Sequence, residues 1–140
     1  MTNDEASHEP GWSETMGVNV VRASPDEVIA EIDIAPRHRQ ALGLVHGGVY
    51  SGLIETAASL GASLVARARG EAPPVGVENH TSFLRSAREG RIRVTATPIS
   101  RGRTTQLWEA TIKDASEQIL ATGRVRLIAA PREPSRSTSS

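Results

Sequence analysis

Residues 46–68 read HGGVYSGLIETAASLGASLVARA, and this stretch decides how the rest of the chain is interpreted. Its apolar side chains recur at helical spacing, at Val49, Tyr50, Leu53, Ile54, Ala57, Ala58, Leu60, Leu64 and Val65. These positions cover most of the circumference of a helix, and a helix that is apolar nearly all round belongs inside a structure. The stretch therefore predicts one long buried helix over 47–68.

Segments on both sides of this helix alternate between apolar and polar residues, as strands with one buried face do. The expected strands cover about 16–22, 28–34, 75–83, 92–96, 108–112 and 119–127. The connections near 100–103 and 113–117 are short enough for antiparallel hairpins. This order of elements predicts an α+β fold in which an antiparallel sheet wraps around one long central helix.

The chain has 140 residues, a length that fits one domain. Residues 1–11 and 131–140 are polar and lack apolar periodicity, so we expect flexible tails around a domain over 12–130. The 16 basic and 16 acidic side chains balance and the few aromatic residues are dispersed, so nucleic acid is not an expected partner. We identify no apolar run of the roughly 18 residues that a membrane span needs, and therefore expect a cytoplasmic protein without a membrane segment.

The chain contains no cysteine, which excludes disulfides, thiolate metal ligands and a cysteine nucleophile. No pair of histidines has the spacing of metal ligands, so we predict no metal site. We also expect no cofactor. His80 is expected in a satisfied structural role on a strand, whereas His8 and His38 are expected to be exposed.

Glu55 is the only charged residue between His46 and Arg67. Burying an unpaired carboxylate costs several kcal/mol or keeps the group protonated. Glu55 therefore lies at a subunit interface, or accepts hydrogen bonds from neighbouring backbone, or is a catalytic carboxylate. Ser51 and Ser59 lie one helical turn before and after it and could orient it, although each serine alone fits a hydroxyl bonded to its own helix.

His46-Gly47-Gly48 marks the start of the expected helix, where the amides of the first turn are unpaired and carry the positive end of the helix dipole. Glycine allows a substrate to approach such amides closely, and a thioester oxygen held there would be stabilised as in an oxyanion hole. A plain helix start explains the glycines equally well. The acidic residue nine positions after His46 makes the catalytic interpretation the more specific one.

The stretches RQALGLVHGGVYSGLIETAASLGA and NHTSFLRSAREGRIRV, at 39–62 and 79–94, resemble the hotdog-fold thioesterases. The likeness extends over 17–128. It is strongest to the branch that contains the Arthrobacter-type 4-hydroxybenzoyl-CoA thioesterases, the phenylacetate-pathway thioesterases and the dihydroxynaphthoyl-CoA thioesterases. This resemblance implies a hotdog fold and homodimers with two active sites at the shared interface, which usually assemble into homotetramers.

The resemblance also implies a role for several residues. The family's carbonyl-polarising amide falls on Gly47, its catalytic acid on Glu55, its loop glutamine and histidine on Gln40 and His46, and its water-holding hydroxyl on Ser59. At this last position similar enzymes have threonine. Positions that grip the nucleotide end of coenzyme A fall on Arg85, Arg103 and Thr104, and Arg103 replaces the small hydroxyl residue expected there.

The activity implied is hydrolysis of an acyl-CoA thioester, with an aromatic acyl group favoured because similar enzymes prefer one. Glu55 would act either as the nucleophile that forms a mixed anhydride or as a general base on water. Two alternatives remain, an enoyl-CoA hydratase or dehydratase on the same fold and a non-catalytic acyl-CoA-binding module. The first is expected to carry a different motif around its histidine, and the second does not require a buried acid.

Overall fold

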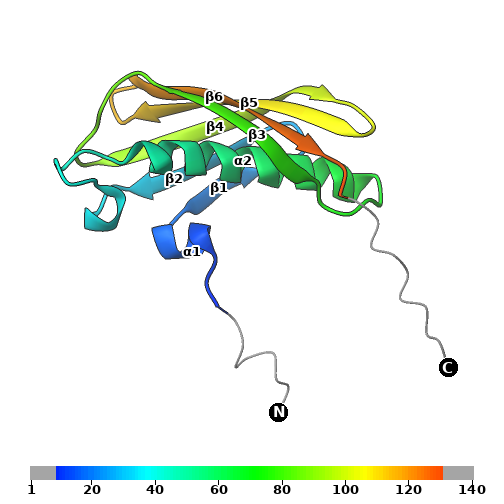
Figure 1. Ribbon diagram of the computed structural model, residues 1–140, viewed down its shortest axis with the longest axis horizontal. Coiled ribbons are helices and arrows are strands. Elements are labelled where there is room, and N and C mark those ends of the chain that lie inside the picture. Colours follow the sequence, from blue (N-terminus) through cyan, green and yellow to red (C-terminus); the bar gives the residue numbers. More distant parts are fainter. Residues whose placement is uncertain (1–8, 131–140) are drawn as a thin grey trace, which may run out of the picture.

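The computed structural model describes residues 9–130, and these form a six-stranded sheet and one long helix (Figure 1). The elements are α1 (Trp12–Met16), β1 (Asn19–Ala23), β2 (Val28–Asp33), the 3-10 helix η1 (Pro36–His38), α2 (Gly47–Ala68), β3 (Val75–Phe83), β4 (Arg91–Arg101), β5 (Thr105–Asp114) and β6 (Ile119–Ile128). Most of the expected tail residues, and His8 with them, lie outside the described part of the chain, so the predictions made for them stay predictions.

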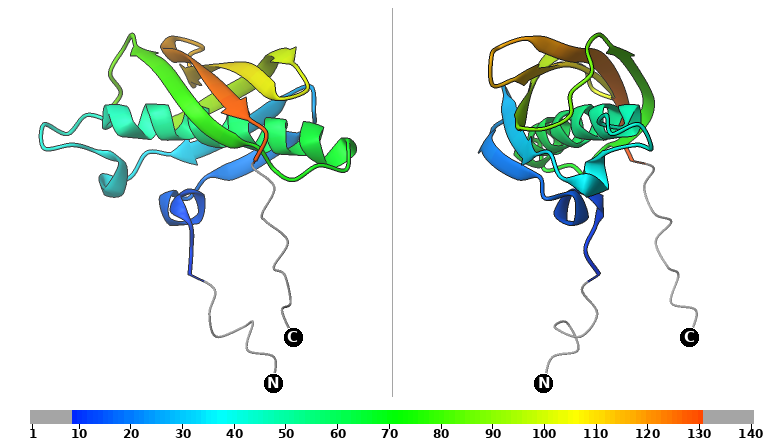
Figure 2. Two further views of the ribbon diagram at one scale, coloured as in Figure 1. Left: turned by 45° about the vertical axis from the view of Figure 1, so that its right-hand side comes forward. Right: turned by 90° about the vertical axis from the view of Figure 1, so that its left-hand side faces the viewer.

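The strands pair in the order β1-β2-β4-β5-β6-β3, and every neighbouring pair is antiparallel. The sheet curls around α2, which is seen nearly end-on in the right panel of Figure 2. The predicted fold class, an antiparallel sheet wrapped around one long central helix, is therefore confirmed. Strands β1 and β3 form the two edges of the sheet, and β3 lies beside α2.

The core is formed by the inner face of the sheet and the face of α2 turned toward it. Trp108 of β5 is fully buried against Gly61, where a β-carbon would lie 2.4 Å from its ring. Its indole N–H donates to Gln106 Oε1 at 2.9 Å, and Gln106 Nε2 donates to the carbonyl of Ala62 at 3.1 Å. The helix thus satisfies the polar atoms that accompany the largest side chain of the core.

Helix α2 has 22 residues and a hydropathy of 1.3 over its most apolar 18-residue window, which by length and composition would allow it to cross a membrane. The sequence shows no unbroken apolar run of that length, because serine, threonine and Glu55 interrupt the apolar residues of α2, and the high mean hydropathy of the helix was not anticipated. The sheet covers the helix, and 56% of that window is buried inside the protein. Packing in the core explains its apolar character.

Two predictions about histidines were also wrong. His38 is fully buried: its Nδ1 accepts a hydrogen bond from the Ala35 amide at 2.9 Å, and its Nε2 lies 2.8 Å from the carbonyl of Met16. Since Nδ1 accepts, the ring proton lies on Nε2, which donates to Met16. His80 is exposed on β3, and its ring has no hydrogen bond within residues 9–130. The sequence did not indicate the short helix α1, whose end His38 joins to the loop before α2.

We expect His38→Leu to lower the free energy of unfolding, because it leaves the Ala35 amide and the Met16 carbonyl without their partner. Each buried group left unsatisfied costs about 1–3 kcal/mol. Urea denaturation followed by tryptophan fluorescence measures the effect. The matched control is His80→Leu, which should stay within about 0.5 kcal/mol of the wild type. Equal, small effects of the two substitutions would contradict the structural role of His38.

Candidate active site

His46 is the N-cap residue of α2, and its ring holds the first turn in place. Its Nδ1 accepts a hydrogen bond from the Gly48 amide at 2.7 Å. A β-carbon at Gly48 would lie 2.8 Å from the same nitrogen, so glycine makes room for the ring. The Val49 amide donates to the His46 carbonyl at 2.8 Å. His46 therefore uses two of the amides that a helix start leaves unpaired.

The Gly47 amide has no hydrogen-bond acceptor among residues 9–130. It lies on a cavity of about 230 Å³ that is lined by Gln40, Leu44, Val45, Gly47, Tyr50, Phe83, Leu84, Arg85 and Ser86. Because the positive end of the α2 dipole lies here, a carbonyl oxygen that entered the cavity would be polarised by a free N–H group. The cavity brings together three residues predicted for the site: Gly47, Gln40 and Arg85.

Aromatic side chains close one wall of this cavity, and sequence reasoning assigned them no role in the site. The rings of Tyr50 and Phe83 are tilted at 57° with centroids 6.0 Å apart. The Tyr50 hydroxyl donates to the Arg85 carbonyl at 3.1 Å. A β-carbon at Gly47 would lie 2.4 Å from the Phe83 ring, so only glycine fits beneath it. The signal available in the sequence was the aromatic residue at the end of the strand before Arg85.

Gln40 belongs to a tight loop that precedes α2. Its backbone amide donates to the Leu44 carbonyl at 2.8 Å, and the Gly43 amide donates to the Gln40 carbonyl at 2.9 Å. Its side-chain Oε1 accepts from the Leu42 amide. The carboxamide nitrogen has no partner among the described residues, and Gln40 lines the cavity.

Glu55 lies two turns further along α2 and is half-buried. Its Oε2 is buried and has no hydrogen-bond partner within residues 9–130. A β-carbon at Gly76 of β3 would lie 2.7 Å from Oε1, so the carboxylate packs directly against the backbone of that strand. Burial raises the pKa of Glu55, and a hydrogen bond from the Asn79 side chain partly opposes this effect.

Ser51 and Ser59 lie on the face of α2 that carries Glu55, as the helical spacing predicts. Within the described residues, neither hydroxyl has a hydrogen bond to the carboxylate. Strand β3 supplies the polar contact instead, because Asn79 Nδ2 donates to the Ser51 carbonyl at 3.0 Å. Sequence reasoning did not identify Asn79, which is separated from Ser51 by 28 positions.

The three residues predicted for the nucleotide end of coenzyme A are not brought together within one chain. Arg85 lies at the cavity beside the first turn of α2. Arg103 and Thr104 lie near the other end of the helix, with Arg69, whose guanidinium donates to the carbonyls of Arg101 and Gly102 at 2.7 and 2.9 Å. A helix of 22 residues is about 33 Å long, so these groups are far apart.

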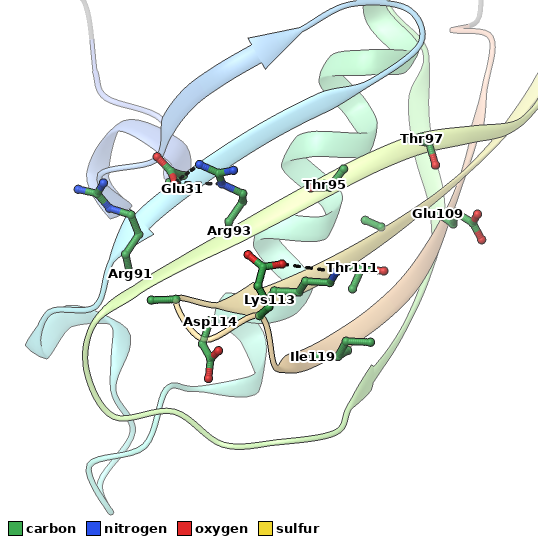
Figure 3. Close-up of a pocket in the computed structure, with 13 residues that line it drawn as sticks. Glu31, Arg91, Arg93, Thr95, Thr97, Glu109, Thr111, Lys113, Asp114 and Ile119 are labelled. Carbon is green, nitrogen blue, oxygen red and sulfur yellow. Dashed lines mark hydrogen bonds and ion pairs between the residues drawn. The ribbon is translucent and has the colours of Figure 1, made fainter.

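A hollow of about 720 Å³ lies on the face of the sheet turned away from α2 (Figure 3). Its charged side chains include two ion pairs. Arg93 and Glu31 form an ion pair at 2.9 Å, and Lys113 lies 3.7 Å from the carboxylate of Glu117. It contains neither the free helix amide nor the buried acid. Among the described residues, no group of three or more His, Cys, Asp or Glu could hold a metal ion.

Comparisons with known proteins show the family to which the chain belongs. Residues 42–121 match the thioesterase superfamily. The chain is 42% identical over 113 residues to a proposed esterase of Mycobacterium tuberculosis strain H37Rv, covering 80% of this chain and 81% of that one. A solved structure of the mycobacterial protein matches with a TM-score of 0.83 at 38% identity, covering 88% of this chain and 98% of the other.

A second relative is the 1,4-dihydroxy-2-naphthoyl-CoA hydrolase of Listeria monocytogenes, which is 32% identical over 117 residues, or 81% of this chain and 91% of that one. The solved structure of a Haemophilus influenzae thioesterase matches with a TM-score of 0.80 at 26% identity and covers 96% of this chain and 91% of the other. The chain therefore belongs to the thioesterase superfamily. It has the hotdog fold, and it is a thioester hydrolase.

We expect Glu55→Gln to raise the melting temperature at pH 8 by a few degrees, which corresponds to a gain on the order of 1 kcal/mol in the free energy of unfolding. The raised pKa of Glu55 means that the folded state holds the proton more tightly than the unfolded state does. The charged carboxylate therefore destabilises the fold above its folded pKa, and this cost disappears as the pH falls through that value. Calorimetry from pH 8 to pH 4 should show the gain shrinking.

The control for this measurement is Glu78→Gln, which replaces an exposed carboxylate on the same sheet edge as Gly76. Its melting temperature should follow that of the wild type at every pH. A Glu55→Gln variant that is less stable than the wild type at pH 8 would show that the charged carboxylate does not destabilise the folded state.

Proposed function

We propose that the protein hydrolyses acyl-CoA thioesters with an aromatic acyl group, as a member of the branch that holds the 4-hydroxybenzoyl-CoA and phenylacetate-pathway thioesterases. The observation that carries the proposal is Gly47, which lines a cavity at the positive end of α2 and whose amide has no acceptor among the described residues. The same helix carries Glu55, whose buried Oε2 has no hydrogen-bond partner among those residues. The aromatic wall formed by Tyr50 and Phe83 and the name of the Listeria relative support an aromatic acyl group.

The spacing along α2 supports a site shared by two chains. Gly47 and Glu55 are separated by about 12 Å along the helix axis. A thioester carbonyl must lie about 3 Å from the amide that polarises it and about 3–3.5 Å from the group that attacks it. One chain therefore cannot act on one carbonyl with both groups. In a pair of antiparallel helices, Gly47 of one chain would lie beside Glu55 of the other, and the two-fold axis would generate two such sites.

Strand β3 is the edge through which we propose that the homodimer forms. It has nine residues, its outer edge is unpaired, and Val77, Phe83 and Leu84 are 52%, 56% and 60% exposed. A long edge strand with exposed apolar side chains invites pairing with another strand. We further propose that dimers assemble into a homotetramer in the cytoplasm, that residues 12–130 form the hotdog domain, and that 1–11 and 131–140 are tails.

In the proposed reaction, the Gly47 amide binds the thioester oxygen and stabilises the negative charge that develops on it. The partner's Glu55 attacks the carbonyl carbon and expels the coenzyme A thiolate, and water then opens the resulting mixed anhydride. Alternatively, Glu55 takes a proton from a water that attacks the same carbon. Ser59 would hold this water, while Gln40 and His46 complete the pocket of the other chain.

The same arrangement accounts for the separated coenzyme A residues. In an antiparallel pair, the C-terminal half of one α2 extends beyond the N-terminus of the other. Arg103 and Thr104 of one chain would then lie toward the same end of the shared site as Arg85 of the other chain. The nucleotide end of coenzyme A would thus be bound by residues of both chains. Arginine suits this role because its guanidinium matches phosphate oxygens.

We expect thiol release from a panel of aromatic and aliphatic acyl-CoAs, fastest with an aromatic member, and a loss of at least about 100-fold in Glu55→Gln. A thiol-reactive dye follows the reaction, and Glu78→Gln is the matched control. Wild-type turnover by Glu55→Gln on every thioester would refute the role of Glu55. Binding without thiol release would indicate a binding module, and hydration of an enoyl-CoA would indicate a hydratase.

A shared site can be tested by complementation between chains. Glu55→Gln and Gly47→Pro should each be inactive alone. Glu55→Gln removes the acid, and Gly47→Pro removes the polarising N–H group, since proline fits the first helical position but has no backbone N–H. Both chains carry Phe83→Ala, since a β-carbon at Gly47 would meet that ring. A heterodimer purified through two different tags should recover about half of the activity of the Phe83→Ala dimer, since one of its two sites is intact. No recovery would contradict the shared site.

A further inference from the structure

Strand β3 presents polar residues to α2 on its inner face, and the charged side chain of the strand lies on its outer face. Asn79 pairs with buried Val125 and Thr81 pairs with Gly123, so both point toward the helix. Glu78 and His80 pair with the exposed Arg126 and Arg124 and point to the other face. The inner face of β3 therefore carries uncharged hydrogen-bonding groups at the level of Glu55.

The Asn79 carboxamide is held in one orientation. The Thr81 hydroxyl donates to Asn79 Oδ1 at 2.6 Å, which leaves the amide nitrogen facing α2. That nitrogen donates to the carbonyl of Ser51 at 3.0 Å. Ser51 lies one turn before Glu55 on the same helical face, so this contact places the Asn79 amide one helical turn from Glu55, and an amide nitrogen carries a second N–H that can donate.

Two glycines make room for these groups. A β-carbon at Gly76 would lie 2.7 Å from Glu55 Oε1, and a β-carbon at Gly123 would lie 2.7 Å from Thr81 Oγ1. The first glycine lets the carboxylate lie against β3. The second lets the Thr81 hydroxyl reach Asn79. A side chain at either glycine would therefore displace one of the groups on which the contact depends.

We propose that Asn79 is the positioning residue of Glu55: its side-chain amide, oriented by Thr81, holds the Glu55 carboxylate against β3 in the direction from which it acts on the thioester. This proposal rests on the function proposed above. Asn79 does not touch substrate, and it acts through Glu55.

The electrostatics of Glu55 agree with this geometry. Burial raises its pKa, and the hydrogen bond from Asn79 is the influence that lowers it. On α2 the residues one turn away are Ser51 and Ser59, which carry no charge, and the inner face of β3 carries none either. The short helix α1 contacts α2 through Trp12, at Gly52, and through Ser13, at Thr56. Asn79 is therefore the group whose interaction lowers the pKa of Glu55 against the effect of burial and so favours the ionised form.

The test compares Asn79→Leu, which keeps the size of the side chain and removes its donor, with the wild type. We expect kcat to fall about 10- to 100-fold, as loss of a hydrogen bond to a charged group predicts, with little change in KM. The acidic limb of the pH profile of kcat/KM should move to higher pH, because the pKa of Glu55 rises when its donor is lost. Thr81→Val should cause a smaller change in the same direction, and Ser82→Ala, on the outer face, should cause none.

A fall in activity with an unchanged acidic limb would show that Asn79 is merely structural and would overturn the proposal. Titration of the Glu55 carboxyl carbon by NMR gives a second answer without any substrate. A higher pKa in Asn79→Leu supports the contact, and an unchanged pKa overturns it. If the wild type releases no thiol, the proposed function fails, whereas the NMR titration still decides whether Asn79 controls Glu55.

Discussion

The structure depends on the burial of α2 inside the curled sheet. A helix with one charged residue between its first turn and Arg67 is poorly solvated by water, and the inner faces of the strands provide the apolar surface it needs. The close contact of Trp108 with Gly61 fixes how deeply the helix sits. With the helix held in this way, the positions of its free first amide and of its acid are determined by its rise per residue.

Glu55 is the exception to the rule that the core excludes charge. It occupies the boundary between the face of α2 that packs on the sheet and the face that does not, where burial raises its pKa and one oxygen has no partner. A fold selected for stability alone would place a neutral residue there. Unfavourable burial of a titratable group is found more often at active sites than elsewhere, and there stability is lost in exchange for reactivity.

The sequence predicted the elements whose signals are local. The bounds of α2 and β3 were predicted as they are observed, because helical and alternating periodicities are read within a few residues. The burial of His38, the contact of Gln106 with the helix and the contact of Asn79 with Ser51 were not predicted, since each depends on partners at least 22 positions away. The shift in register between Gly76 and Glu78 also changes which residues of β3 face α2, and simple alternation does not reveal it.

Strand β3 links the chemistry to the assembly. Its inner face contacts Glu55 through Gly76 and carries Asn79, while its open edge exposes Val77 and Phe83. If two chains pair along this edge, water is removed from the surroundings of Glu55, and desolvation raises the pKa of a carboxyl group. A donor that favours the ionised form then becomes more important in the dimer than in the single chain. Strand β3 would thus form the dimer contact and also carry Asn79, whose hydrogen bond offsets the desolvation of Glu55 that the contact causes.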